Sequence, residues 1–244
     1  MPGALTRESR GIDTDALLST ATQLRTALQR AALPLELTGV DDARDERDAI
    51  VQQLDDYVLP RLRDLDAPAV AVVGGSTGAG KSTIVNSLVG AEVTQPGVLR
   101  PTTRAPVLVH HPSDTSWFTD DRILPGLARV TGTTARGPTE IVLVPLDRLP
   151  EGLALIDAPD IDSVVDENRA LASQLLDAAD LWVFVTTAMR YADAVPWTFL
   201  RRAAQRGVGI ALVLNRVPTG AGPELRSHLQ RMLADERLAE TPVI

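Results

Sequence analysis

The sequence predicts an α/β fold, in which a mostly parallel β-sheet is covered by helices on both faces and preceded by an N-terminal helical extension. From residue 68 onward, short apolar runs alternate with segments of helical periodicity, which is typical of a parallel sheet with helical crossovers. A glycine-rich turn separates the first apolar run from the first of these helices. Before residue 68, apolar residues recur at helical spacing. We therefore expect a helical segment over residues 1–66 and an α/β domain over residues 67–244.

Two helices are expected in the N-terminal segment. The first covers residues 14–33, where apolar residues at alternating spacings of four and three form one stripe: Leu17, Ala21, Leu24, Leu28 and Ala31. The second covers residues 41–65 and begins on the acidic run "DDARDE", which suits a helix N-terminus, and Pro60 should kink or interrupt it. Two interpretations are open. The helices cover one side of the domain, or they belong to a bundle completed by chain that is not present here.

The α/β domain is expected to contain six strands and the start of a seventh. The β-rich runs lie at residues 69–75, 105–111, 139–146, 152–157, 181–187 and 209–215, and the start of the last strand lies at 241–244. Helical stretches are expected at residues 81–90, 167–179, 194–206 and 222–238. This alternation is the basis for a mostly parallel sheet.

The composition narrows the range of functions. With 244 residues, the chain is long enough for one sizeable α/β domain with helical additions. A net charge of −8 argues against a broad electrostatic grip on nucleic acid, so we expect no nucleic-acid partner. The absence of cysteine excludes disulfides and thiolate zinc sites. The first 15 residues have no apolar signal core and no apolar run reaches the length of a membrane span, which predicts a cytoplasmic protein.

The stretch "GGSTGAGKST", residues 74–83, is typical of a phosphate-binding loop. It fits the pattern G-x-x-x-x-G-K-[ST] in full and lies between an expected strand and an expected helix, which is the context that this pattern requires. Backbone N–H groups of such a loop turn inward as an anion nest, and the dipole of the following helix adds to the attraction. The candidate nucleotide-binding residues of the loop are Gly75, Ser76, Thr77, Gly78, Ala79, Gly80, Lys81, Ser82 and Thr83.

Three residues around this loop are candidates for catalysis and metal binding. Lys81 is the single lysine among 24 basic residues, and its compact ammonium fits between phosphate oxygens where a forked guanidinium is too wide. It should reach the β- and γ-phosphates, and the hydroxyl of Ser82 should bind Mg²⁺. The apolar strand in "LALIDAPDIDS" ends on Asp157, whose carboxylate is expected to hold the same Mg²⁺ through water.

The order of the phosphate loop, "RPTTRAP", "DAPD" and "LNRVP" resembles the G-motif series of translation-factor-class GTPases, and within that class the dynamin-like and related bacterial GTPases. The wording "GSTGAGKS" is also similar to immunity-related and septin-type GTPases. The resemblance covers residues 68–244 and implies a P-loop NTPase fold that takes Mg²⁺ with GTP or GDP. It also implies homo-oligomeric assembly at the inner face of a membrane, through helices partly missing here. The fifth motif is expected just after "TPVI", so that the domain would be truncated before it.

The resemblance implies roles for the two switch segments. Thr103 corresponds to the switch I threonine that closes over Mg²⁺ and the γ-phosphate, with Thr102 as the alternative and a polar loop without that role also open. Asp157 matches the aspartate of D-x-x-G, and Asp160 occupies the glycine position. The charge and restricted backbone of Asp160 weaken closure, or its side chain turns away to cap the next helix. Ile161 cannot orient water, so slow hydrolysis is expected.

The fourth motif leaves the identity of the base open. In the family pattern N/T-K-x-D, the aspartate accepts two hydrogen bonds from guanine, which adenine cannot supply. Here "NRVP" gives Asn215 and Arg216, whose planar guanidinium can stack on a purine, followed by Pro218, which recognises nothing. The sequence therefore leaves ATP and ADP as candidate ligands beside GTP and GDP.

Two other functions remain open as well: an ATP-directed P-loop enzyme, and a nucleotide-gated binding module. Arg190 follows a strand end, where a surface salt bridge is favoured over a contact with phosphate or with a partner.

Overall fold

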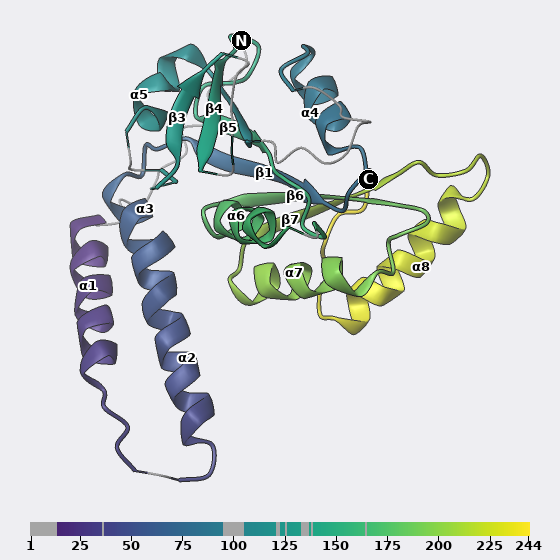
Figure 1. Ribbon diagram of the computed structural model, residues 1–244. Helices are drawn as coiled ribbons and strands as arrows, with labels where there is room; N and C mark the ends of the chain where they lie inside the picture. Colours follow the sequence, from purple (N-terminus) through teal and green to yellow (C-terminus); the bar gives the residue numbers. More distant parts are fainter. Residues whose placement is uncertain are drawn as a thin grey trace, which may run out of the picture. The chain divides into compact units, whose positions relative to one another are not determined.

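The computed structural model describes residues 14–244 apart from residues 36, 95–104, 121–122, 125, 133–136, 138 and 164. The chain divides into two compact units, Met1–Leu65 and Asp66–Ile244. The described part of the first unit is helical, and the second unit carries the β-sheet (Figure 1). No helix in the described ranges is long and apolar enough to cross a membrane.

The first unit contains a pair of helices that lie side by side (Figure 1). They are α1 (Thr14–Arg30) and α2 (Val40–Gln53), followed by a π-helical turn (Leu54–Val58) and by α3 (Leu59–Arg63). An ion pair of 2.7 Å between Arg25 and Asp55 joins α1 to the π-helical turn. The sequence predicted a kink or interruption at Pro60. The α-helical pattern indeed gives way to the wider π turn just before Pro60, whose missing N–H cannot continue the regular hydrogen bonding.

The helix pair buries little of its apolar stripe. No residue of α1, which is described in full, is buried, and Leu17 and Leu24 are 44% and 49% exposed. Among the side chains of this unit that the structure describes, the buried apolar ones are Leu54 and Leu59. The interpretation that a further helix covers the stripe stays a prediction.

The second unit is built on a seven-stranded sheet. Its strands are β1 (Ala69–Gly75), β2 (Val107–His110), β3 (Ala128–Thr131), β4 (Glu140–Pro145), β5 (Leu153–Asp157), β6 (Leu181–Thr187) and β7 (Gly209–Asn215). Their order is β3-β4-β2-β5-β1-β6-β7. Among these strands, β2 and β5 pair antiparallel and all the other neighbours pair parallel, which confirms the mostly parallel sheet. The expected last strand is present as a parallel bridge between Leu212 of β7 and Val243.

Helices cover both faces of this sheet, as the sequence predicted. The main ones are α4 (Lys81–Val89), α6 (Asp166–Asp177), α7 (Ala194–Gln205) and α8 (Gly222–Asp235), which are labelled in Figure 1. Successive residues of β1 point to opposite faces: Val70 and Val72 belong to a core shared with α6, α7 and α8. Val73 belongs to a second core, together with Val85 of α4. The central strand is therefore buried on both faces, as expected for parallel strands.

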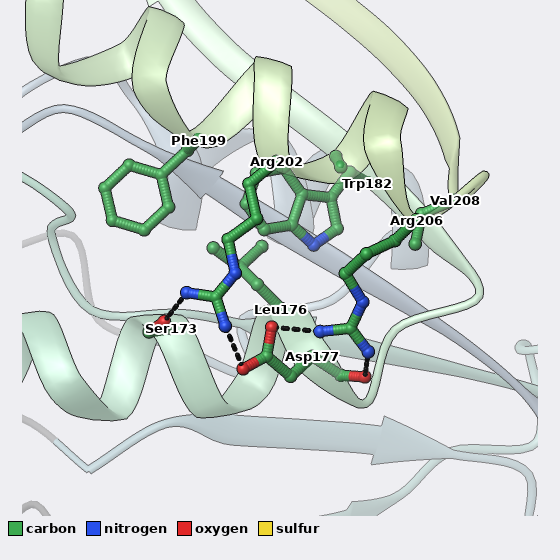
Figure 2. A pocket seen from close by; sticks show the side chains of 9 residues that line it. Ser173, Leu176, Asp177, Trp182, Phe199, Arg202, Arg206 and Val208 are labelled. Atoms are coloured by element: carbon green, nitrogen blue, oxygen red, sulfur yellow. Dashed lines mark hydrogen bonds and ion pairs between the residues drawn. The ribbon is translucent and has the colours of Figure 1, made fainter. Parts of the chain in front are cut away.

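A small cavity between α6 and α7 is a packing feature (Figure 2). Arg202 donates to Ser173 at 2.6 Å and pairs with Asp177 at 2.6 Å, and Arg206 pairs with the same carboxylate. The cavity has a volume of about 10 Å³, which holds at most about one water molecule. The buried indole N–H of Trp182, which lines it, has no hydrogen-bond partner among the described residues, so a single water is the occupant that fits.

Candidate functional site

The glycine-rich loop connects β1 to α4, and two of its positions require glycine, Gly75 through a close backbone contact and Gly80 through its left-handed backbone conformation. A Cβ atom on Gly75 would lie 2.1 Å from the carbonyl oxygen of Val185, because β1 and β6 are adjacent at this point. Gly80 has φ 100°, and a Cβ atom there would lie 2.4 Å from the side-chain nitrogen of Asn215. The first helical residue of α4 is Lys81.

The remaining loop positions differ in exposure. The side chains of Ser76 and Ala79 are buried, whereas Gly78 and Thr83 are exposed. Because α4 begins at Lys81, the positive end of its dipole and the N–H groups of its first turn face the end of the loop. This is the arrangement expected for anion binding.

Asp157 ends β5 next to the start of α4. Its Oδ2 accepts hydrogen bonds from Ser82 Oγ at 2.7 Å and from Thr94 Oγ1 at 2.8 Å. Its Oδ1 is buried and has no hydrogen-bond partner among the described residues. Burial raises the pKa of Asp157, and the hydrogen bonds from the two hydroxyls offset only part of this effect.

This arrangement fits a magnesium ion. A buried carboxylate oxygen without a donor favours a cation, and Mg²⁺ is usually held by one or two protein oxygens together with phosphates and water. Ser82 and Asp157, for which the sequence predicts magnesium binding, lie within hydrogen-bond distance of each other, and their role as metal ligands stays a prediction. Thr94, which was not predicted, lies at the same carboxylate. No group of three or more His, Cys, Asp or Glu side chains that could hold a metal by itself occurs in the described part of the chain.

Lys81 lies inside the loop with its ammonium fully engaged. The residue is 6% exposed, and Nζ donates to the carbonyl oxygens of Gly75 at 3.0 Å and Ser76 at 3.1 Å. Its third partner is Oδ1 of Asp160, at 2.5 Å. An ammonium has three donors, so a phosphate oxygen would have to replace one of these acceptors. Asp160, as an anion, is the acceptor that a phosphate resembles.

The position of Asp160 tests one of the two expectations for this residue, and the effect on closure stays a prediction. A role as the cap of the next helix is wrong, because α6 begins at Asp166 after Val165, and the side chain of Asp160 turns to Lys81 instead. The attraction between carboxylate and ammonium explains this orientation. Ile161 is 1% exposed and lies in the apolar core, where it cannot contact water.

Asp162 makes a second carboxylate contact with the loop. It accepts hydrogen bonds from the backbone N–H of Thr77 at 2.7 Å and from the Thr77 hydroxyl at 2.9 Å, and pairs with Arg190 at 2.7 Å. Burial alone would raise the pKa of Asp162, but these hydrogen bonds and the charge of Arg190 outweigh it, and the pKa is lowered. Arg190 also pairs with Asp193 and donates to the Thr77 carbonyl at 3.3 Å. The expected salt bridge is therefore confirmed, and it extends to the loop.

The lowered pKa of Asp162 predicts how stability changes in acid. Such a carboxyl stabilises the folded state above its unfolded pKa of about 3.9, and the contribution disappears as the pH falls through the folded value. We expect the melting temperature of the protein minus that of an Asp162→Asn variant to be constant near neutrality and to shrink below about pH 4. Asp157, whose pKa shifts upward, is present in both proteins, so its contribution to the pH dependence cancels in the difference between the two melting temperatures. A difference that persists unchanged to about pH 3 would contradict this assignment.

The fourth motif contacts the loop through one residue. Asn215 ends β7, and its side-chain nitrogen donates to the carbonyl oxygen of Ala79 at 2.8 Å. Its Oδ1 accepts from the backbone N–H of Arg216, which has φ 53° and an exposed side chain. Pro218 is exposed as well. Thr102 and Thr103 lie outside the described residues. The structure thus brings the loop, Asp157, Asp160 and Asn215 to one edge of the sheet, at the carboxyl ends of β1, β5 and β7.

Comparison with known proteins gives similarity at the level of structure. No family model matches the sequence, and no curated protein matches it. A bacterial dynamin, solved as an oligomerised pair, is 14% identical with a TM-score of 0.53, over 98% of this chain and 40% of that chain. Era from Aquifex aeolicus, bound to GDP·AlF4−, is 19% identical with a TM-score of 0.45, over 73% and 50% of the two chains. Toc33 from Arabidopsis thaliana, in complex with Mg²⁺ and GMPPNP, is 16% identical with a TM-score of 0.41, over 79% and 77%.

The likeness to bacterial dynamin concerns the fold. This chain spans about two-fifths of the length of that dynamin chain. The glycine-rich loop lies between the first strand, β1, and α4, which agrees with the motif order found in the sequence. The strand order and the helices on both faces agree with the fold that this motif order implies. The second unit therefore has a P-loop NTPase fold, which it shares with the chain of that bacterial dynamin.

Proposed function

We propose that residues 67–244 bind a guanine nucleotide with Mg²⁺ and hydrolyse GTP slowly. The observation that carries this proposal is the convergence of Lys81, Ser82 and Asp157 at one sheet edge, with a buried and unpartnered oxygen on Asp157. Asn215 supports it by bonding the same loop from β7. When bound, Mg²⁺ supplies positive charge beside the phosphates.

Each residue of the site then has a defined task. The loop N–H groups and Lys81 hold the phosphates, Ser82 and Asp157 hold the metal, and Thr103 closes over both. Asn215 fixes the loop beside the base, and Arg216 stacks on the base with its guanidinium. Hydrolysis is slow because the position that would orient water carries the buried Ile161. A nucleotide-gated binding module is the second candidate, favoured by the contact between Asp160 and Lys81.

One experiment separates these candidates. Nucleotide released from the purified protein by denaturation would be identified by chromatography, and turnover of GTP and ATP would then be measured with and without Mg²⁺. We expect bound guanine nucleotide and slow, Mg²⁺-dependent GTP turnover. Bound nucleotide without any turnover would support the binding module, and failure to bind either nucleotide would contradict the proposal.

We expect the protein to prefer GTP over ATP only weakly. Phosphates and Mg²⁺ are common to both ligands, and Pro218 stands where the family has the aspartate that reads guanine. Hydrogen bonds to a charged group contribute roughly 1.5–3 kcal/mol each, so their loss lowers the selectivity strongly. The preference should lie within about a hundredfold, measured by competition of both nucleotides against a fluorescent GDP analogue.

The variant Pro218→Asp is the complement to that measurement. It should raise the preference for GTP, provided that the exposed loop keeps its path without the fixed φ of proline. Pro223→Asp, at the start of α8, is the matched control, because it makes the same exchange away from the fourth motif. Steep guanine selectivity in the unmodified protein would contradict the expectation and indicate that another group reads the base.

We also propose that the chain is part of a dynamin-like protein that forms homo-oligomers at the inner face of a membrane, and that residues 1–66 belong to a helical bundle. Support comes from the half-exposed stripe of α1 and from the fold-level likeness to a bacterial dynamin pair described in terms of tethering membranes. Sedimentation of the unmodified chain and of a Leu24→Asp variant tests the first step. We expect the unmodified chain to self-associate more strongly, and equal behaviour would contradict the role of this stripe.

A further inference from the structure

Asn86 of α4 holds a short stretch of chain that lies beside the site. Its Oδ1 accepts hydrogen bonds from the backbone N–H groups of Val93 at 3.0 Å and Thr94 at 3.1 Å. Its Nδ2 donates to the carbonyl oxygen of Thr94 at 2.7 Å. One side chain therefore satisfies both backbone polar groups of Thr94, which fixes this residue relative to the first turns of α4.

The fixed backbone directs the Thr94 hydroxyl to Asp157. Thr94 Oγ1 and Ser82 Oγ both donate to Oδ2 of this carboxylate, at 2.8 and 2.7 Å, and Oδ1 has no partner among the described residues. Two donors on one oxygen fix the rotation of the carboxylate about its Cβ–Cγ bond. The oxygen that remains open is then the one available to a metal ion or to its water.

We propose that Thr94, held by Asn86, is a positioning residue of the magnesium site and acts on the cation through Asp157. The inference deepens the proposed function and rests on it. Groups that orient a metal-binding carboxylate typically change metal affinity by about ten- to a hundredfold when they are removed. A residue that only anchored the loop would change nucleotide binding in the absence of metal as well.

The test compares Thr94→Val, which keeps the branched shape and loses the hydroxyl, with Thr94→Ser, which keeps the hydroxyl. Dissociation of a fluorescent GDP analogue would be followed as a function of free Mg²⁺ and in excess EDTA. We expect Thr94→Val to raise the half-saturating Mg²⁺ concentration about ten- to a hundredfold and to leave dissociation in EDTA unchanged. The half-saturating Mg²⁺ concentration of Thr94→Ser should stay within about twofold of that of the unmodified protein.

Asn86→Ala should have the same effect as Thr94→Val, because it releases the backbone that aims the hydroxyl. Ser87→Ala is the matched control on α4, since its exposed hydroxyl bonds the Thr83 carbonyl of its own helix and makes no other hydrogen bond to the described residues. Melting curves confirm that each variant is folded.

Two results would overturn the inference. One is an unchanged Mg²⁺ requirement in folded Thr94→Val, and the other is faster dissociation in EDTA by the same factor as in Mg²⁺, which would make Thr94 a loop anchor only. Failure of the proposed function looks different, because the unmodified protein would then not retain the GDP analogue even in excess Mg²⁺. The inference would fall with it.

Discussion

Replacement of Lys81 with alanine is expected to abolish nucleotide binding and to leave the fold intact. The ammonium is the positive charge inside the loop, and each hydrogen bond between it and a phosphate is worth roughly 1.5–3 kcal/mol. Loss of contacts to two phosphates therefore lowers affinity by more than about a hundredfold. The fold should persist, because the apolar cores on the two faces of the sheet do not depend on this side chain. Isothermal titration calorimetry with GTP and ATP, together with a melting curve, measures both effects.

The control for this variant removes a positive charge elsewhere. Arg231→Ala, on the exposed side of α8, changes the net charge by the same amount without touching the loop. Its affinity for GTP should equal that of the unmodified protein. If Lys81→Ala retained full affinity for both nucleotides, the assignment of the loop as the phosphate site would be refuted.

Replacement of Asp160 with glycine is expected to raise affinity for a non-hydrolysable GTP analogue more than affinity for GDP. The carboxylate lies 2.5 Å from Nζ of Lys81, so an incoming γ-phosphate must compete with it and approach its negative charge. Two like charges about 4 Å apart repel by about 1–4 kcal/mol at the edge of a protein, which corresponds to about five- to several-hundredfold in affinity. GDP lacks the third phosphate and gains less. Displacement of a fluorescent nucleotide measures the two affinities.

Two further variants separate charge from backbone freedom. Asp160→Asn removes the charge and keeps a side chain, so it should give most of the gain if repulsion is the cause. Asp166→Asn, in the first turn of α6, is the control for a change of net charge at an exposed carboxylate. An equal gain for both nucleotides, or no gain, would show that Asp160 does not act on the third phosphate.

The fold could be predicted where burial leaves a pattern in the sequence. Strands β1, β5 and β6 are buried on both faces, so their runs are almost continuously apolar. The edge strand β3 was missed because none of its four residues, all of which are described, is buried. Instead, Arg129 of this strand anchors it to the neighbouring chain, because its guanidinium donates to the carbonyl oxygens of Phe118 and Leu124 at 3.0 Å each. Such contacts leave no periodicity.

The site could be predicted where its residues are neighbours in sequence. The loop, Lys81 and Ser82 follow one another, and their spacing is imposed by the turn from strand to helix. The contacts of Thr77 with Asp162 and of Thr94 with Asp157 join positions 85 and 63 residues apart. Only the strand order brings these positions together, and neither composition nor spacing encodes it.

The single antiparallel pairing in the described sheet lies between β2 and β5. Because of it, some strands end at the edge of the sheet that carries the glycine-rich loop and others end at the opposite edge. Val107 lies opposite Asp157, whereas His110 lies opposite Ala154, so β2 and its parallel neighbour β4 end at the edge of the sheet remote from the glycine-rich loop. The exposed turn at Pro150 and Glu151 connects β4 to β5 on that remote edge. Insertions at this turn would not impair nucleotide binding at the opposite edge of the sheet, so selection for that binding would not have removed them during evolution. The same turn is accordingly the place to graft a reporter protein or an affinity handle, where it would leave phosphate binding undisturbed.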